Sequence, residues 1–124
     1  MDMTEIDRIV AALSTVRMPA MPEEYDIHAG VAEALDAAGL AYVHEYRLAP
    51  RCRIDFLAGR VGIEVKKGRP SQRALEKQLR RYLVSSDLDA AVVVVQRAVS
   101  LPATLCGKPV FIVSLDRLWG VALP

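Results

Sequence analysis

The sequence has little cysteine and no long hydrophobic run. Its 124 residues include two cysteines, Cys52 and Cys106, which lie too far apart to form a CxxC pair. That spacing excludes a disulfide framework and the usual kind of zinc site. The longest apolar stretch, residues 90–95, is far shorter than the ~20 residues that a membrane-spanning helix needs. We therefore expect no membrane contact.

Other common signals are missing as well. The N-terminus carries Asp2, Glu5 and Asp7 where a secretory leader would carry positive charge, so we expect a cytoplasmic protein. The chain has no Gly-rich phosphate loop and no Ser-His-Asp order. With 52% hydrophobic and 25% charged residues, its composition is that of a globular protein. The length fits a single domain.

The formal net charge of +1 conceals a strong separation of charge. Residues 1–45 contain nine acids and two bases, whereas residues 66–81 contain seven bases and one acid. A dense basic block in an otherwise acidic chain is a candidate contact for a polyanion. The alternative is a solvated helix face with no binding role.

Apolar periodicity and turn residues predict an α/β fold. Helices are expected from about residue 4 toward Pro19, at 23–38 and at 71–84, and strands at 41–47, 52–57, 61–66, 90–95 and 110–113. Short helical turns are expected at 103–106 and 116–119. The β-branched run at 90–95 is typical of a strand buried on both faces. Within a single domain, residues 1–20 are expected to form a helix that packs on or extends a core formed by 21–124.

Two acidic residues are predicted to face each other in the hairpin of residues 52–66. If Gly59-Arg60 is a two-residue turn of type II′, Asp55 stands directly opposite Glu64. Their Cβ atoms would lie about 4.5–5.5 Å apart. Two carboxylates ~5 Å apart repel by roughly 3 kcal/mol at an effective dielectric constant of 20. The pair therefore favours a bound cation, and its hard oxygen ligands favour Mg²⁺ or Mn²⁺.

Lys66 lies two residues beyond Glu64, on the same face of its strand. It is placed to meet an anion at such a metal, where it would orient an attacking water or stabilise phosphorane charge. A one-residue shift of register would separate the carboxylates. The alternative is an exposed Glu-x-Lys pair, with Asp55 as a solvated acid near a turn.

Asp55 followed by Glu64-Val65-Lys66 resembles the D…(D/E)-x-K signature of the PD-(D/E)XK nuclease superfamily. Residues 78–82, Gln78-Leu79-Arg80-Arg81-Tyr82, resemble the QxxxY motif of RecB-type members, with Gln78 and Tyr82 on one helix face. The resemblance covers residues 23–95 and extends distantly to GxxExxY-type bacterial proteins. It implies a restriction-endonuclease-like αβββαβ core, with a central mixed sheet flanked by helices.

The resemblance also implies a set of metal ligands. Asp55 and Glu64 would hold Mg²⁺ or Mn²⁺, and the carbonyl of Val65 would be a further ligand. Glu24, on the helix before the sheet, would be an outer ligand. His28, one turn later, is an additional candidate, and the sequence leaves the choice between the two open.

Further roles follow from the same resemblance. Lys66 would position the water, while Gln78 and Tyr82 would brace the site. The basic residues that flank the Glu64–Lys66 strand and the next helix would clamp phosphates; they are Lys67, Arg69, Arg73, Lys77, Arg80 and Arg81. His44 and the two cysteines show no ligand spacing, so we interpret them as a strand-surface histidine and buried thiols.

The sequence thus predicts a Mg²⁺- or Mn²⁺-dependent deoxyribonuclease, either an exonuclease or an endonuclease. It leaves open whether the enzyme is specific for a particular DNA structure. A small chain without accessory domains favours a homodimer or a subunit of a larger DNA-processing complex. One alternative is a catalytically inactive module of the same fold that binds DNA. Cleavage of RNA is the other.

Overall fold

The computed structural model describes residues 3–19 and 21–116, which form an α/β fold with three helices and a six-stranded mixed sheet. The helices are α1 (Met3–Leu13), α2 (Glu24–Ala37) and α3 (Gln72–Leu83). The strands are β1 (Val43–Ala49), β2 (Cys52–Ala58), β3 (Val61–Lys66), β4 (Ala90–Val95), β5 (Thr104–Leu105) and β6 (Lys108–Ser114). No described helix has the length and apolar character to cross a membrane.

The sheet has the strand order β1-β2-β3-β4-β6-β5. Strands β1, β2 and β3 pair antiparallel, whereas β3, β4 and β6 pair parallel. Parallel neighbours need a crossover connection, which α3 supplies between β3 and β4. All six residues of β4 are buried, as the β-branched run predicted.

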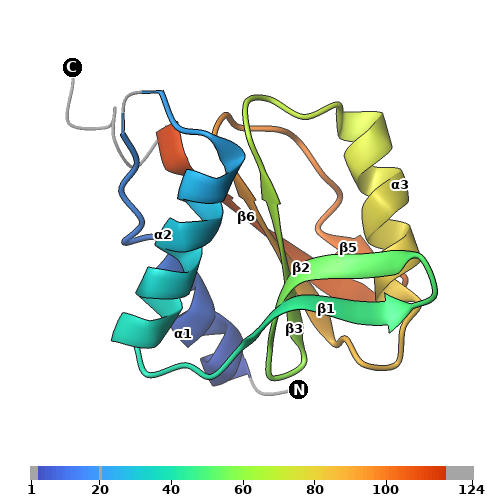
Figure 1. Cartoon of the computed structure of the whole chain (residues 1–124). Coiled ribbons are helices and arrows are strands. Elements are labelled where there is room, and N and C mark those ends of the chain that lie inside the picture. The colour runs from blue at the N-terminus through green and yellow to red at the C-terminus, as the bar shows by residue number, and fades with distance from the viewer. Residues whose placement is uncertain (1–2, 20, 117–124) are drawn as a thin grey trace.

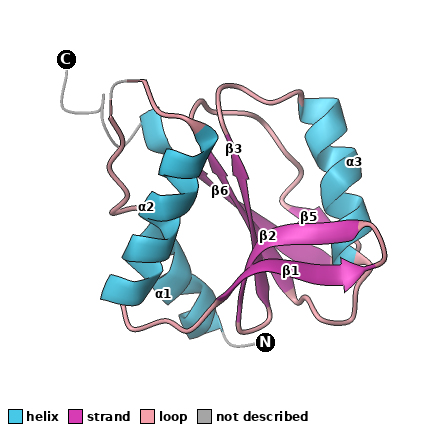
Figure 2. Ribbon diagram, in the orientation of Figure 1, coloured by secondary structure: helices cyan, strands magenta, loops and turns pink. Residues whose placement is uncertain are grey.

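Helices cover both faces of the sheet (Figures 1 and 2), with α1 and α2 on one side and α3 on the other. One hydrophobic cluster joins α1 and α2 to the sheet through residues such as Ile9, Ile27 and Phe56. A second cluster joins α3 to the opposite face through residues such as Leu79 and Val93. The central strands β3 and β4 are therefore buried on both sides, whereas β1 at the edge is largely exposed. Functional groups must reach solvent at the sheet edges and strand ends.

Three local predictions were wrong. Residues 103–106 form no helical turn, because Thr104–Leu105 pairs antiparallel with Lys108–Pro109. Between them, Cys106 and Gly107 have φ values of 53° and 74°, and two consecutive residues with positive φ are typical of a tight hairpin turn. Cys106 is consequently exposed, although Cys52 is buried as expected.

The first helix is shorter than the sequence indicates, since it ends at Leu13. There the hydroxyls of Ser14 and Thr15 donate to the carbonyls of Val10 and Ala12, which competes with continuation of the helix. The connector that follows still buries Val16 and Met18 in the core. The predicted turn at 116–119 extends over residues 117–119, which lie outside the described residues.

Candidate metal and nucleic-acid site

The β2–β3 hairpin has the register that the turn residues predicted. Phe56 pairs with Ile63, Leu57 with Gly62, and Ala58 with Val61. Gly59 has a φ of 60°, a conformation that favours glycine and opens a type II′ turn. One further step along this register brings Asp55 opposite Glu64.

The regular strand pairing is interrupted on both sides of Asp55. The β2–β3 ladder ends at the Phe56–Ile63 pair. On the other side, β1 pairs through His44 and Tyr46, but the intervening Glu45 has a φ of 59°. A non-glycine residue in this left-handed region is strained, and such strain gathers at functional sites. Figure 1 shows β1 and β2 turning across the direction of β3 and reaching toward α3.

Each carboxylate of the pair holds the backbone of the opposite strand. The Val65 N–H donates to Asp55 Oδ2 at 2.7 Å, and the Asp55 N–H donates to Glu64 Oε1 at 3.3 Å. These two bonds replace ladder bonds where the strands separate. They fix both carboxylates near the carboxyl end of β3, where the Val65 side chain is buried in the cluster that joins α1 and α2 to the sheet.

Glu64 is the one charged residue that is fully buried in the described part of the chain, with 3% of its surface exposed. Burial, and then the neighbouring Asp55, raise the pKa of Glu64 to about 7. Lys66 opposes this shift, because its Nζ lies 3.4 Å from Glu64 Oε2. Ionisation of Glu64 beside Asp55 is therefore unfavourable unless more positive charge than that of Lys66 lies nearby.

The α3 helix supports Glu64 through two side chains one turn apart. Gln78 Nε2 donates to the Tyr82 hydroxyl at 2.8 Å. The Tyr82 oxygen lies 3.1 Å from Glu64 Oε2 and 3.2 Å from the Arg53 carbonyl. Burial and the nearby Glu64 raise the pKa of Tyr82, so it remains a hydrogen donor. Gln78 and Tyr82 therefore connect β2, β3 and α3 at the carboxylate pair.

The two candidates on α2 differ in their placement. His28 Nε2 lies 3.7 Å from Asp55 Oδ2, so His28 is beside the carboxylate pair. Glu24 is exposed in the first turn of the helix. In residues 3–19 and 21–116, no three His, Cys, Asp or Glu side chains are grouped closely enough to hold a metal ion.

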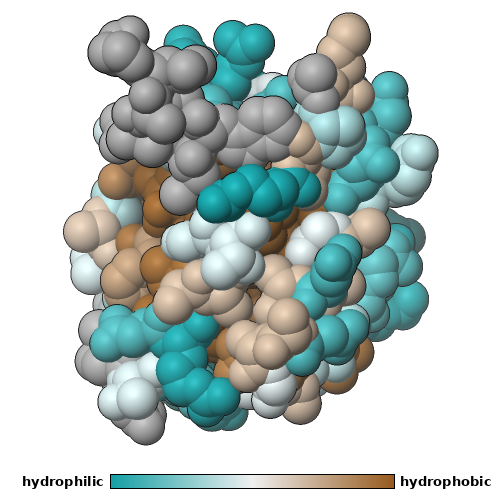
Figure 3. Space-filling view, turned by 90° about the vertical axis from the view of Figure 1, so that its left-hand side faces the viewer, coloured by the Kyte–Doolittle hydropathy of each residue, from teal (hydrophilic) through white to brown (hydrophobic). Residues whose placement is uncertain are grey.

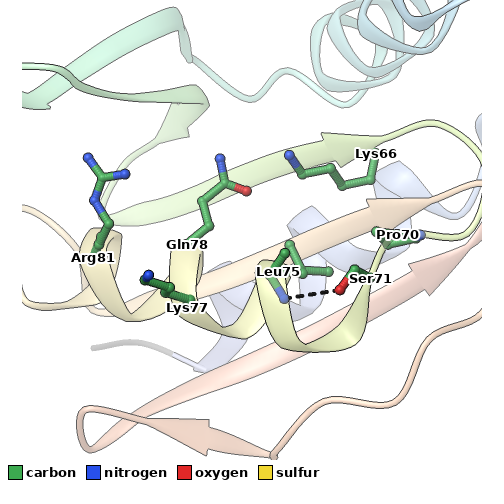
Figure 4. Close-up of a pocket in the computed structure, with 8 residues that line it drawn as sticks. Lys66, Pro70, Ser71, Leu75, Lys77, Gln78 and Arg81 are labelled. Atoms are coloured by element: carbon green, nitrogen blue, oxygen red, sulfur yellow. Dashed lines mark hydrogen bonds between the residues drawn. The ribbon is translucent and has the colours of Figure 1, made fainter.

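Next to Lys66, the structure has an open cavity of about 410 Å³. Lys66, Gln78 and Arg81 extend into the same space from β3 and α3 (Figure 4), and Lys77 also lines it. The loop that joins these elements is held in place, since the Gly68 N–H donates to Gln96 Oε1 at 2.8 Å. Ser71 then caps α3 by accepting from the Ala74 N–H at 3.2 Å. The cavity thus combines three cations with the amide of Gln78.

The remaining predicted phosphate contacts fall into two groups. Two already have acidic partners: Lys67 Nζ lies 3.3 Å from Glu23, and Arg80 Nη2 lies 3.0 Å from Glu76. Arg69 and Arg73 are exposed. A second open cavity of about 420 Å³ follows the outer side of α3, lined by Gln72, Arg73, Glu76, Lys77 and Arg80. The α3 surface is thus mainly charged, whereas the side of the molecule formed by α1 and α2 has both hydrophobic and hydrophilic residues (Figure 3).

Sequence reasoning missed one residue next to the site. His44 Nε2 lies 3.0 Å from His28 Nδ1, and the His44 ring stacks on Phe56 with ring centroids 4.5 Å apart. His44 is exposed on its strand, as predicted, but its contact with His28 was not predicted. Antiparallel pairing of 41–47 with 52–57 is the sequence signal that would have placed His44 opposite Phe56.

Comparison of the chain with protein-family models, with curated proteins and with solved structures found no match.

Proposed function

We propose that this chain is a metal-dependent nuclease that hydrolyses DNA phosphodiester bonds, built on a restriction-endonuclease-like core of the PD-(D/E)XK type. The observation that carries the proposal is the interlocked pair of Asp55 and Glu64, with Lys66 beside it. Carboxylates that repel each other, one of them buried, are favoured at a site that takes up a cation.

The donor types at this site are those that Mg²⁺ and Mn²⁺ prefer, and the side chains would have to draw closer together around a bound ion. Asp55 and Glu64 offer hard carboxylate oxygens, to which the Val65 carbonyl would add a third. His28, which lies beside Asp55, would complete the set more directly than the exposed Glu24. When bound, the metal would polarise the phosphate and lower the pKa of the attacking water.

The chain's own side chains would then act around the phosphate. Lys66 would orient the water and offset the negative charge that develops on the phosphate oxygens. Gln78 and Tyr82 would keep Glu64 in place, because their hydrogen bonds restrain its side chain. Lys77 and Arg81, in the same cavity, would hold neighbouring phosphates. The more distant bases would add affinity that does not depend on sequence.

A cleavage assay tests the proposal. Purified protein is incubated with linear, nicked, single-stranded and four-way-junction DNA, and with RNA, in the presence of Mg²⁺ or Mn²⁺ or with EDTA. Cleavage is expected with metal in the wild type and should be lost in Glu64→Ala and Lys66→Ala. Glu33→Gln, which changes an exposed acid on α2, is the matched control and should cleave like the wild type. Equal cleavage by wild type, Glu64→Ala and Lys66→Ala would overturn the catalytic roles.

A second candidate function is an inactive module of the same fold that binds DNA, alone as a homodimer or within a larger complex. One observation favours it: the Lys66 ammonium already lies 3.4 Å from Glu64, where it provides a positive charge without a metal. This alternative predicts DNA binding that is unchanged by EDTA, with no cleavage of any substrate. Metal-dependent cleavage that is lost in Lys66→Ala would exclude it.

A further inference from the structure

Three side chains in contact, Asp55, His28 and His44, form a row from the carboxylate pair to the edge strand β1. His28 on α2 has one ring nitrogen, Nε2, 3.7 Å from Asp55 Oδ2 and the other, Nδ1, 3.0 Å from His44 Nε2. The centroids of the His28 and His44 rings are 5.3 Å apart, whereas the two nitrogens are 3.0 Å apart. The difference is about twice the distance from a ring centre to one of its atoms. The two nitrogens therefore face each other along the line that joins the rings, as in a direct hydrogen bond.

Packing holds both imidazole rings in this orientation. The His44 ring stacks on Phe56 at 4.5 Å with an interplanar angle of 19°, and the His28 ring lies 5.5 Å from the same phenyl ring. Tyr42 contacts the edge of Phe56 at 5.7 Å. Phe56 itself is fully buried. Phe56 therefore packs against both histidines, His28 on α2 and His44 on β1, and restrains the two rings.

The hydrogen bond between the rings decides which nitrogen of His28 carries the proton. A neutral imidazole has one N–H donor and one acceptor nitrogen. If His44 Nε2 accepts, the His28 proton is on Nδ1, and the lone pair of Nε2 points toward Asp55. If His44 donates, the proton is on Nε2 instead. Only the first arrangement leaves Nε2 free to bind a cation.

We propose that His44 is a positioning residue that accepts a hydrogen bond from His28 and thereby presents His28 Nε2 to a divalent cation held by Asp55 and Glu64. The inference rests on the proposed function, because it takes the carboxylate pair as a metal site. A histidine ligand commonly needs such a partner on its second nitrogen. It gives a role to a residue that touches neither carboxylate.

Two replacements of His44 separate its hydrogen bond from its packing. His44→Phe keeps an aromatic ring over Phe56 but has no acceptor. His44→Gln loses the ring but offers an amide oxygen that can accept from His28 Nδ1. Val43→Ala, a change of an exposed neighbour on β1, is the control. Mn²⁺ affinity is measured by calorimetry for the wild type, these three variants, His28→Ala and the double variant His28→Ala/His44→Phe.

We expect His44→Phe and His28→Ala each to weaken Mn²⁺ binding roughly 10- to 100-fold, as losses of such partners do. His44→Gln should recover most of the affinity, and the double variant should be no weaker than His28→Ala alone. In ¹⁵N NMR with Mg²⁺, the proton of His28 should be on Nδ1 in the wild type and shift to Nε2 in His44→Phe.

The possible failures are distinguishable. If His28→Ala weakens binding but His44→Phe does not, the role of His44 is wrong and the metal site stands. If His44→Phe and His44→Gln weaken binding equally, His44 acts through packing, which also overturns the inference. If the wild type binds neither Mn²⁺ nor Mg²⁺, the proposed function fails and this inference fails with it.

Discussion

The two ends of the β2–β3 hairpin are built in opposite ways. At the turn end, residues 56–58 pair regularly with 61–63, and Phe56, Val61 and Ile63 are fully buried. At the carboxylate end, which comprises Asp55, Glu64 and Lys66, the ladder stops and side-chain oxygens accept the backbone N–H groups. One short hairpin therefore provides apolar packing at one end and concentrated charge at the other.

In the proposed nuclease, this difference between the two ends marks where stability is given up for catalysis. The regular end has the local choices that a stable hairpin favours, with a glycine at the turn and apolar side chains facing the core. The carboxylate end departs from them, through a strained Glu45 on the adjacent strand and a buried acid whose pKa is raised to about 7. Such departures are expected where function, rather than folding, selects the residue.

The largest expected effect is on catalysis at the carboxylate end. Asp55→Asn and Glu64→Gln should each lower metal-dependent DNA cleavage by about a thousandfold or more, because metal-ion catalysis is worth several kcal/mol. Val61→Ala, at the turn end, removes buried methyl groups and should destabilise the fold while the folded protein keeps its cleavage rate. Single-turnover assays on labelled DNA check this. Comparable losses for Val61→Ala and Glu64→Gln would erase the functional distinction between the two ends.

The next largest effect concerns stability at the turn end. Phe56→Ala should lower the free energy of unfolding by about 3–5 kcal/mol, since it empties a fully buried aromatic site. Urea unfolding followed by circular dichroism measures the change. A loss below about 1 kcal/mol would show that the turn end is not the stable part of the hairpin.

At the carboxylate end, the wild-type residue Glu64 should lower the stability of the fold at high pH when EDTA removes divalent cations. The pKa of Glu64 is raised from 4.5 to about 7, so the native state holds this proton more tightly than the unfolded chain does. The stability that the proton gives is complete below pH 4.5 and is lost as the pH rises through 7. At about 1.4 kcal/mol per pKa unit, the loss amounts to about 3 kcal/mol.

Glu64→Gln resembles the protonated form, and it should therefore remove this pH dependence. Above pH 7 the variant should be more stable than the wild type in EDTA, although it should not cleave DNA. Unfolding free energies between pH 4.5 and pH 8.5 give the difference curve, with Glu33→Gln as the control that should parallel the wild type. A Glu64→Gln curve parallel to the wild type would contradict the burial effect on Glu64.

The smallest expected effect is on DNA binding by single bases near the carboxylate end. Lys77→Ala should lower the slope of log affinity against log salt by about 1, because one phosphate contact is lost. Arg8→Ala, an exposed base on α1, should leave the slope unchanged. Fluorescence anisotropy at several salt concentrations measures both slopes. An equal change for the two variants would assign binding to overall charge instead of the α3 surface.

Much of the hairpin was predictable from sequence because its determinants are local. Gly59-Arg60 sets the register, and the register sets Asp55 opposite Glu64. Gln78 and Tyr82 meet because i and i+4 residues share a helix face, and their hydrogen bond has a length of 2.8 Å. The buried strand at 90–95 followed from an uninterrupted β-branched run.

The contacts that the sequence did not predict depend on long-range geometry. The ladder break at Asp55 involves the backbone of Glu45, whose positive φ has no residue-type signal. The contact of His44 with His28 joins β1 to α2 across 16 residues of the chain. For Cys106-Gly107, the turn glycine was interpreted as a helix end because glycine serves both structures.

Metal-dependent stabilisation tests the central claim most directly. Unfolding of the wild type and of Glu64→Gln is measured with EDTA and with increasing Mn²⁺. If Asp55 and Glu64 hold the ion, Mn²⁺ at 100 times its Kd should add about 2.7 kcal/mol to the stability of the wild type and little to the variant. No stabilisation of the wild type, or equal stabilisation of both proteins, would contradict the claim that the carboxylate end is a metal site.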